Sequence, residues 1–398
     1  MKNICRTIVS AATAALLVPF ASLAADKGPG THFVPPKGTA NVVSNSPSRA
    51  DAKKFTVAFL GGSITEMSGF RPRVIKALRE KYPHCDFREI AAGLSSTCSD
   101  TGAFRLRQDV LSKGTPDLFI VEAAVNDDQD GHFSSQHSIR GMEGIVRQVL
   151  IENPSCAVVV AMMVNVAQYN DLMKDKTPLH YAAHAKVARH YGAAVADVGS
   201  ALAKSAKSGG LSWKEYRDCH PSPAGCDLGA QVVFDAVQKV FDPDKERKPI
   251  SIPAPLDKMS YFNARFLAPD EIKLGKGWNF SAPDWSKIPG SKRFYFTRGE
   301  SIWTETPGSV LEFSFKGTSA GALLTAGPDA GDIEVSIDGG EFKTHKLRAY
   351  YGSLHYPYLL ILADDLTEGR HTVKIRSKSA VRKNKPCVAV RIYRLGVN

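Results

Sequence analysis

The pattern of apolar and polar positions divides the chain near residue 255. Between residues 51 and 245, short apolar runs alternate with longer segments whose apolar positions recur at helical spacing. Continuous apolar runs are typical of strands buried on both faces of a parallel sheet. The predicted strands are residues 56–60, 86–92, 117–125, 157–164 and 193–198. The predicted helices are residues 71–82, 102–113, 138–153, 179–191 and 224–241. This alternation predicts a three-layer α/β/α domain around a five-stranded parallel sheet.

Residues 255–398 follow a different pattern, which begins after a charged, proline-bearing linker at residues 242–255. Apolar and polar residues alternate over short runs there, as in strands with one buried face. Asp338-Gly339-Gly340 is a hairpin signal between two such runs. The sequence therefore predicts a C-terminal all-β domain, most simply a sandwich of the jelly-roll type.

Residues 1–24 have the pattern of a secretory signal peptide. Lys2 and Arg6 precede an apolar run, and Ser22-Leu23-Ala24 offers a small-x-small cleavage site. Residues 25–50 are rich in proline, glycine and serine, which predicts an irregular lead-in. No later segment has the length to span a bilayer. We therefore expect an exported protein, periplasmic or extracellular, that does not insert into the membrane.

The composition is that of a globular protein, with 43% hydrophobic and 23% charged residues. A length of 398 residues favours two domains. The formal net charge is +11, or +9 (11 − 2) once Lys2 and Arg6 are lost. A positive charge favours anionic surroundings such as acidic glycans. The lysines and arginines are scattered rather than clustered, which argues against nucleic-acid binding.

Six cysteines follow the predicted signal peptide: Cys85, Cys98, Cys156, Cys219, Cys226 and Cys387. An even number in an exported chain permits disulfides. Cys219 and Cys226 are the closest pair, and a bridge between them would brace the segment around His220. Independent thiols are the alternative.

A serine follows the first predicted strand, in the stretch "FTVAFLGGSITE". Gly61 and Gly62 permit backbone angles that a side chain would obstruct. Ser63 then lies at the carboxyl end of a strand, where open α/β sheets keep their ligand sites. An ordinary glycine turn with a capping serine is the alternative for this stretch alone.

Further polar residues come at the ends of neighbouring strands. The small-residue loop 93–99 follows the second strand, and Asn126 and Asp127 follow the third. His220 precedes the last predicted helix, with Asp218 two residues before it. A nucleophilic serine needs a base and also donors for the oxyanion that it creates. A plain turn or a structural histidine would explain each residue alone, but their convergence on one sheet edge favours a catalytic site.

These stretches resemble the conserved blocks of the SGNH (GDSL-type) hydrolase family of serine esterases, over roughly residues 51–245. "GGSIT" resembles the family's Gly-Asp-Ser-Leu motif, which implies that Ser63 is the nucleophile. "VND" resembles the third block, which implies that Asn126 donates to the oxyanion. "DCHPSPAG" resembles the fifth block, which implies His220 as the base and Asp218 as its partner.

The chain departs from the family pattern in the oxyanion hole. The family's second block has a glycine whose N–H completes the hole, and Ser96 stands at that position, with Gly93 three residues earlier. The resemblance thus implies an oxyanion hole made of the Ser63 and Ser96 N–H groups and Asn126. A serine can serve if its backbone angles permit. The glycine usual two residues before the asparagine is replaced by Ala124.

A second departure concerns the partner of the histidine. The family's aspartate commonly lies three residues before the histidine, where this chain has Arg217. Asp218 lies only two residues before His220. A backbone carbonyl is therefore an alternative group to orient the imidazole.

The resemblance implies acyl transfer through an ester on Ser63, without a metal or cofactor. Exported members of the family with an added β-sandwich resemble carbohydrate esterases, so the expected reaction is removal of O-acetyl groups from a polysaccharide or other glycan. Two alternatives are a lipase or esterase acting on longer acyl esters, and a glycan-binding protein whose esterase site has decayed.

Four residues near these blocks are candidate substrate contacts: Gly93, Arg71, Asp127 and Trp213. Five aromatic residues of the C-terminal domain could stack on sugars or fill its own core: Trp303, Tyr350, Tyr351, Tyr356 and Tyr358. His180 and His184 have the spacing of zinc ligands on a helix, but Tyr181 stands where a zinc protease has its glutamate. Packing is the favoured interpretation of this pair.

Overall fold

The computed structural model describes residues 52–293, 297, 299–347 and 351–398. All of them belong to one compact unit of the chain, which extends from Ala40 to Asn398. The predicted signal peptide and the lead-in at residues 25–50 lie outside the described residues. Within the described ranges, no helix is both long and apolar enough to cross a membrane.

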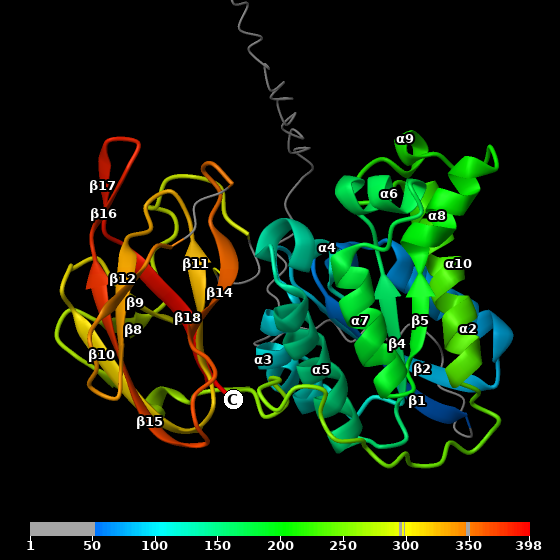
Figure 1. The fold of residues 1–398 in the computed structure, drawn as a ribbon, viewed down its shortest axis with the longest axis horizontal. Helices are drawn as coiled ribbons and strands as arrows, with labels where there is room; N and C mark the ends of the chain where they lie inside the picture. Colours follow the sequence, from blue (N-terminus) through cyan, green and yellow to red (C-terminus); the bar gives the residue numbers. More distant parts are fainter. Residues whose placement is uncertain (1–51, 294–296, 298, 348–350) are drawn as a thin grey trace, which may run out of the picture. The chain divides into compact units, whose positions relative to one another are not determined.

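Five parallel strands form the sheet of the first domain (Figure 1), as predicted. They are β1 (Lys53–Gly61), β2 (Cys85–Gly93), β3 (Leu118–Glu122), β4 (Ala157–Met162) and β5 (Ala194–Asp197). Their order is β2-β1-β3-β4-β5, so β2 and β3 pair with opposite edges of β1 and the direction of winding reverses there. Ligands of open α/β sheets bind beyond the carboxyl ends of the strands at such a switch point.

Helices cover both faces of this sheet (Figure 1). One face packs against α3 (Ser99–Asp109), α5 (Ser135–Glu152) and α7 (Leu179–His190). The other packs against α2 (Phe70–Lys81) and α10 (Pro223–Val240). These five helices match the predicted ones. The shorter helices that were not predicted include α6 (Val166–Met173), α8 (Val198–Lys207) and α9 (Trp213–Tyr216).

The third strand ends earlier than the sequence predicts. The apolar run 117–125 was predicted as one strand, but β3 ends at Glu122. A helical turn, α4 (Ala124–Asn126), and a π-helical turn, η2 (Asp127–Gly131), follow it. The residues of α4 are buried. Hydrophobicity alone does not distinguish a buried strand from a buried helical turn, which explains the error.

Two antiparallel sheets form the C-terminal domain, which confirms the predicted all-β fold. One sheet contains β13 (Lys343–His345), β12 (Asp332–Ile337), β15 (Gly369–Lys378), β10 (Val310–Gly317) and β7 (Ile272–Leu274), in this order. The other contains β14 (Tyr356–Ala363), β11 (Ala320–Ala326), β18 (Val390–Val397), β9 (Ser301–Thr304) and β8 (Asn279–Ser281). Three short strands complete the domain: β6 (Arg265–Phe266), β16 (Ala380–Arg382) and β17 (Lys385–Cys387).

The predicted hairpin joins β12 and β13, whose residues pair in antiparallel register. Asp338 has φ 52° and Gly339 has φ 78°, the left-handed angles that tight hairpin turns need.

The α/β and all-β domains share part of their hydrophobic core. Leu323 of β11 and Leu359 of β14 belong to the same buried cluster as Phe104 of α3. Arg140 of α5 forms an ion pair with Asp364, with a 2.9 Å N–O distance. The β-domain therefore packs directly against helices of the α/β domain.

Candidate active site

The structure brings Ser63 and His220 together. Ser63 is the first residue of α1 (Ser63–Glu66), directly after β1, and His220 lies in the loop between α9 and α10. The Oγ of Ser63 is 2.8 Å from the Nε2 of His220, although the two residues are 157 positions apart. This is the distance of a hydrogen bond through which a histidine can accept a serine proton.

Gly61 and Gly62 clear space for the side chains around them. Gly62 has φ −84°, outside the left-handed region. A Cβ on Gly62 would lie 2.2 Å from the Oδ1 of Asn126, and one on Gly61 would lie 2.4 Å from the Oε1 of Glu122. The two glycines therefore let the side chains that follow β3 approach the turn that carries Ser63.

Glu122, at the end of β3, holds this turn by hydrogen bonds. It was not identified from the sequence. Its Oε1 accepts hydrogen bonds from the Gly62 N–H and the Thr65 hydroxyl, both at 2.8 Å. Its other oxygen, Oε2, has no hydrogen-bond partner in the described part of the chain. Burial raises the pKa of the Glu122 carboxyl. The only sequence signal was an acidic residue at the end of an apolar strand, where a buried carboxyl is unusual.

Ser96 has a backbone conformation that generally favours glycine. Its φ is 65°, in the left-handed region. The loop is held from Glu66 of α1, whose Oε2 accepts a hydrogen bond from the Ser95 N–H at 2.7 Å. A Cβ on Gly93 would lie 2.2 Å from the Glu66 backbone nitrogen, so Gly93 allows β2 to pack against α1. The structure thus gives Gly93 a packing role and leaves Ser96 as the candidate oxyanion donor of this loop.

Asn126 lies beside the Ser63 turn and is 2% exposed. Its Nδ2 donates a hydrogen bond to the Oδ2 of Asp130 at 2.7 Å. Its Oδ1 faces Gly62 and has no hydrogen-bond partner among the described residues. An amide nitrogen carries two hydrogens, so one remains to donate to an oxyanion.

Asp218 does not hydrogen-bond to the imidazole. Its Oδ1 accepts a hydrogen bond from the backbone N–H of His220 at 2.6 Å, but lies 3.7 Å from the ring Nδ1. The Sγ of Cys219 is the nearer atom, at 3.5 Å from Nδ1. In the described part of the chain, no backbone carbonyl hydrogen-bonds to the ring either. The His220 carbonyl accepts a hydrogen bond from the Arg217 side chain. The geometry is that of a Ser63–His220 dyad with a carboxylate nearby.

The environment of His220 keeps the ring neutral. Burial lowers the pKa of His220. The negative charge of Asp218 opposes this shift, while the positive charges of Arg293 and Arg217 reinforce it. Because a general base must be unprotonated, this shift leaves His220 ready to accept a proton at neutral pH.

Two of the candidate substrate contacts have partners within the protein. Arg71 forms an ion pair with Glu89, and its Nε donates to the carbonyl of Thr65 at 3.0 Å. Trp213 stacks on Tyr169, with 5.0 Å between ring centroids. Both side chains are thus engaged by neighbours that hold α1 and the loop before His220.

Asp127 and the zinc-spaced histidines form a buried polar cluster. Asp127 accepts hydrogen bonds from the N–H and hydroxyl of Ser99 at 2.8 and 2.7 Å, and its Oδ2 lies 3.0 Å from the Nε2 of His184. Burial opposes ionisation, but these hydrogen bonds outweigh it and lower the pKa of Asp127. His180 lies 2.9 Å from the hydroxyl of Ser138. These contacts support packing as the role of the histidines and make Asp127 an anchor of α3 rather than a substrate contact.

The predicted Cys219–Cys226 disulfide is not formed. All six cysteines in the described part of the chain are free thiols. The two sulfurs face different groups: Cys219 lies next to His220, whereas Cys226 donates to the carbonyl of Pro221 at 3.6 Å.

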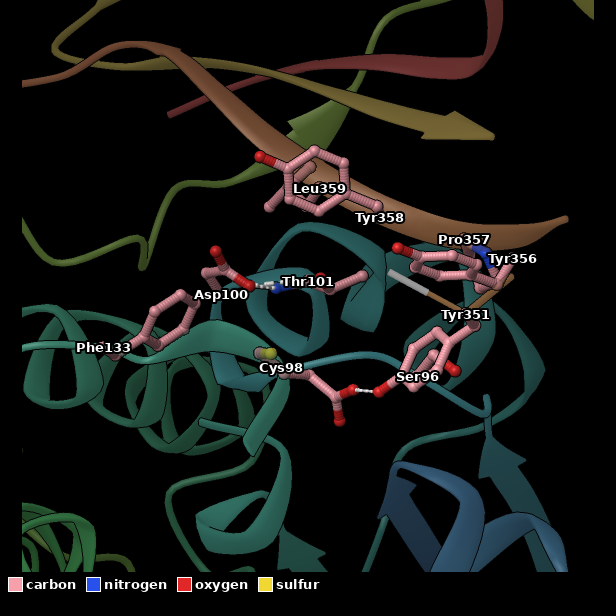
Figure 2. A pocket seen from close by; sticks show the side chains of 11 residues that line it. Ser96, Cys98, Asp100, Thr101, Phe133, Tyr351, Tyr356, Pro357, Tyr358 and Leu359 are labelled. Carbon is pink, nitrogen blue, oxygen red and sulfur yellow. Dashed lines mark hydrogen bonds between the residues drawn. The ribbon is translucent and has the colours of Figure 1, made fainter. Parts of the chain in front are cut away.

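A small pocket lies beside Ser96, and both domains line it (Figure 2). Its lining consists of Ser96, Cys98, Asp100, Thr101, Asp130, Phe133, Tyr351, Tyr356, Pro357, Tyr358 and Leu359. Figure 2 shows Asp100 and Phe133 at one end and Ser96, Tyr351 and Tyr356 at the other. Three of the five candidate aromatics therefore lie at this pocket. Trp303 instead donates to the hydroxyl of Ser281 at 3.0 Å, and Tyr350 lies outside the described residues.

Comparison with known proteins agrees with this architecture. Residues 59–228 match the model of the GDSL-like Lipase/Acylhydrolase family, and residues 292–386 match that of the Carbohydrate esterase 2 N-terminal domain. A two-domain esterase active on acetylated mannans, crystallised with mannopentaose, is similar to the chain with a TM-score of 0.70 and 23% identity, covering 87% of this chain and 91% of that one. A second structure of such an esterase has the same TM-score and coverage at 24% identity. No curated protein matches. The chain therefore contains a GDSL-like lipase/acylhydrolase domain followed by a domain of the carbohydrate esterase 2 N-terminal type.

Proposed function

We propose that this protein is a serine esterase that removes O-acetyl groups from a polysaccharide. The observation that carries the proposal is the 2.8 Å contact between Ser63 Oγ and His220 Nε2 at the carboxyl edge of the sheet. Asn126 lies next to Gly62, the residue before Ser63, and has an amide hydrogen left for the substrate.

The proposed reaction proceeds in two steps. His220 takes the Ser63 proton while Oγ bonds to the acetyl carbon, and the carbonyl oxygen becomes an oxyanion. The N–H groups of Ser63 and Ser96 and the amide of Asn126 stabilise that charge; each donor of this kind is typically worth about 2.7–4 kcal/mol of the barrier. The imidazolium then protonates the departing sugar hydroxyl. Water, deprotonated by His220, attacks the acetyl-enzyme and releases acetate.

The choice of an acetylated polysaccharide rests on two likenesses. The C-terminal domain matches a module named for carbohydrate esterases, and the two-domain esterase with the same architecture acts on acetylated mannans. The formal charge of +9 (11 − 2) without the predicted signal peptide would also favour an acidic glycan. We therefore propose an acetylated glycan, with the neutral or acidic class decided by experiment.

The test is acetate release from acetylated mannan, acetylated xylan and acetylated pectin by the wild-type protein and by Ser63→Ala. We expect release by the wild-type protein alone. Hydrolysis of long-chain acyl esters with no release from any glycan would replace this proposal with the lipase alternative. Binding to a glycan without any turnover would support the decayed-site alternative.

We propose further that the protein is exported with the help of residues 1–24. The support is the basic start, the apolar run and the Ser22-Leu23-Ala24 site. Mass spectrometry of the protein secreted by an expression strain should find Ala25 as the first residue. Retention of the full chain in the cytoplasm would contradict the proposal.

A further inference from the structure

Asp130 joins the candidate oxyanion donor to the C-terminal domain. It lies in the turn η2 and is 7% exposed. Its Oδ2 accepts the hydrogen bond from the Asn126 amide at 2.7 Å. Its Oδ1 accepts a hydrogen bond from the hydroxyl of Tyr351, a residue 221 positions further along the chain. These three side chains form what we call the Asn126–Asp130–Tyr351 chain.

The orientation of the Asn126 amide decides whether it can act as an oxyanion donor. A 180° rotation about the Cβ–Cγ bond of Asn126 exchanges the positions of the amide oxygen and nitrogen, and only the nitrogen donates. The Oδ1 of Asn126 is buried and has no partner among the residues that the structure describes, so no contact there selects the orientation. The opposite orientation would place Oδ1 against the carboxylate of Asp130, where two acceptors repel. Asp130 is therefore the group that selects the donor orientation.

Tyr351 comes from the segment just before β14 and lines the pocket beside Ser96 (Figure 2). The residue as a whole is 42% exposed, but its hydroxyl is engaged with Asp130. Its ring packs edge-to-face on Tyr356, with 4.8 Å between centroids. Burial and the neighbouring Asp130 carboxylate raise the pKa of Tyr351, so the hydroxyl stays a donor. Tyr351 thus restrains one carboxylate oxygen while Asn126 uses the other.

We propose that Asp130 is a positioning residue that turns the Asn126 amide toward the oxyanion, and that Tyr351 of the C-terminal domain holds Asp130 in place. The β-domain is then part of the catalytic machinery and not only a glycan-binding attachment. The inference rests on the proposed esterase function and adds to it two positioning residues.

The first test is steady-state hydrolysis of p-nitrophenyl acetate by three single variants of the full chain. Asp130→Asn keeps the shape of the side chain but replaces one acceptor oxygen by an NH2 donor. We therefore expect kcat to fall about 10- to 100-fold, which is most of the effect of losing one oxyanion donor. Tyr351→Phe should lower kcat by about 5-fold, because one hydrogen bond to a charged group is lost. The KM should change less than about 2-fold in both variants, because an oxyanion donor acts mainly in the transition state.

Tyr261→Phe is the matched control. Like the Tyr351 hydroxyl, the Tyr261 hydroxyl donates a hydrogen bond to a carboxylate, in this case that of Asp364 at 3.1 Å. Tyr261 is not part of the Asn126–Asp130–Tyr351 chain. The Tyr261→Phe substitution should lower the midpoint of thermal unfolding at least as much as Tyr351→Phe does, and it should leave kcat unchanged. Equal losses of kcat in Tyr261→Phe and Tyr351→Phe would show a general effect of domain packing and would overturn the inference.

A double-mutant cycle separates positioning from stability. In an Asn126→Ala background, Tyr351→Phe should have no further effect on kcat, because the amide that it helps to position is gone. An undiminished effect in that background would refute the inference.

A readout independent of turnover is the side-chain amide signal of Asn126 in protein labelled with 15N-asparagine, assigned by its loss in Asn126→Ala. We expect this signal to shift in Asp130→Asn and Tyr351→Phe but not in Tyr261→Phe. Unshifted signals would overturn the inference whatever the kinetics show. Shifted signals in a protein that hydrolyses no ester would support the positioning network and refute the proposed function instead.

Discussion

Replacing Asp218 by asparagine tests whether this site works as a dyad. In the D218N protein the side-chain carbonyl can still accept the hydrogen bond from the His220 backbone N–H, which Asp218 now accepts at 2.6 Å. The loop that carries the histidine should therefore keep its conformation. What disappears is the negative charge near the imidazole.

The interaction energy between that charge and the protonated imidazole depends on their distance and on their exposure to solvent. The Asp218 Oδ1 lies 3.7 Å from His220 Nδ1, and the side chains are 57% and 42% exposed. Two unit charges about 4 Å apart in a water-like medium interact by about 1 kcal/mol. We therefore expect kcat/KM to fall about 5-fold in D218N. In a site whose aspartate holds the imidazole by a buried hydrogen bond, the same change costs about 10⁴-fold.

The pH profile gives a second measure of the same charge. Activity requires neutral His220, so it is present above the pKa of His220 and lost as the pH falls through that value. Asp218 raises this pKa against the larger effect of burial. Its removal should shift the acidic limb of kcat/KM to lower pH. The assay is hydrolysis of p-nitrophenyl acetate between pH 4 and 9. A loss of 10³-fold or more in D218N with unchanged thermal stability would refute the reasoning, because Asp218 would then contact the imidazole during turnover.

Three further variants test the turn and the oxyanion loop. Gly62→Ala would place a Cβ 2.2 Å from the Oδ1 of Asn126 and so displace the Asn126 side chain. Because the amide nitrogen of that side chain is a candidate oxyanion donor, kcat should fall by about 10²-fold. A wild-type kcat would contradict this. Ser96→Gly should keep kcat within about 2-fold. It should change the free energy of unfolding by less than about 1 kcal/mol, because glycine relieves the left-handed φ of 65° but loses more conformational entropy on folding. A large loss of kcat would assign the Ser96 side chain a role. Glu122→Gln should make thermal unfolding less sensitive to a rise in pH above the ordinary pKa of a glutamate. The raised pKa of Glu122 means that its stabilising effect, full below the unfolded-state pKa, is lost as the pH rises through the folded-state pKa; an identical pH dependence in the variant would refute this.

The fold and the reacting groups could be predicted because they depend on local patterns. The apolar runs located the five strands, and the rule that ligands bind at the carboxyl ends of strands selected Ser63 and Asn126. His220 was identified from its place in the loop before the last helix and from the resemblance to the fifth block of the SGNH family. The predicted end of the third strand was wrong because a buried strand passes there directly into the buried turn α4. There the spacing of apolar residues contains no signal for the change.

The supporting residues could not be predicted because their partners lie far away in the sequence. Glu122 is identified only by its contacts with Gly62 and Thr65, about 60 positions earlier. Asp130 and Tyr351 are 221 positions apart, and neither has a motif. The relation of Asp218 to the imidazole depended on side-chain geometry, which residue spacing does not specify.

The shared core determines how the contribution of the C-terminal domain can be measured. Phe104 of α3 packs so closely against β18 that a Cβ on Gly396 would lie 2.5 Å from its ring. The same helix begins at Ser99, three residues after Ser96. Deleting the β-domain would expose this ring and disturb the oxyanion loop even if Tyr351 had no role. A loss of activity on truncation would therefore carry no information about catalysis, whereas Tyr351→Phe removes one oxygen atom and leaves the shared core intact.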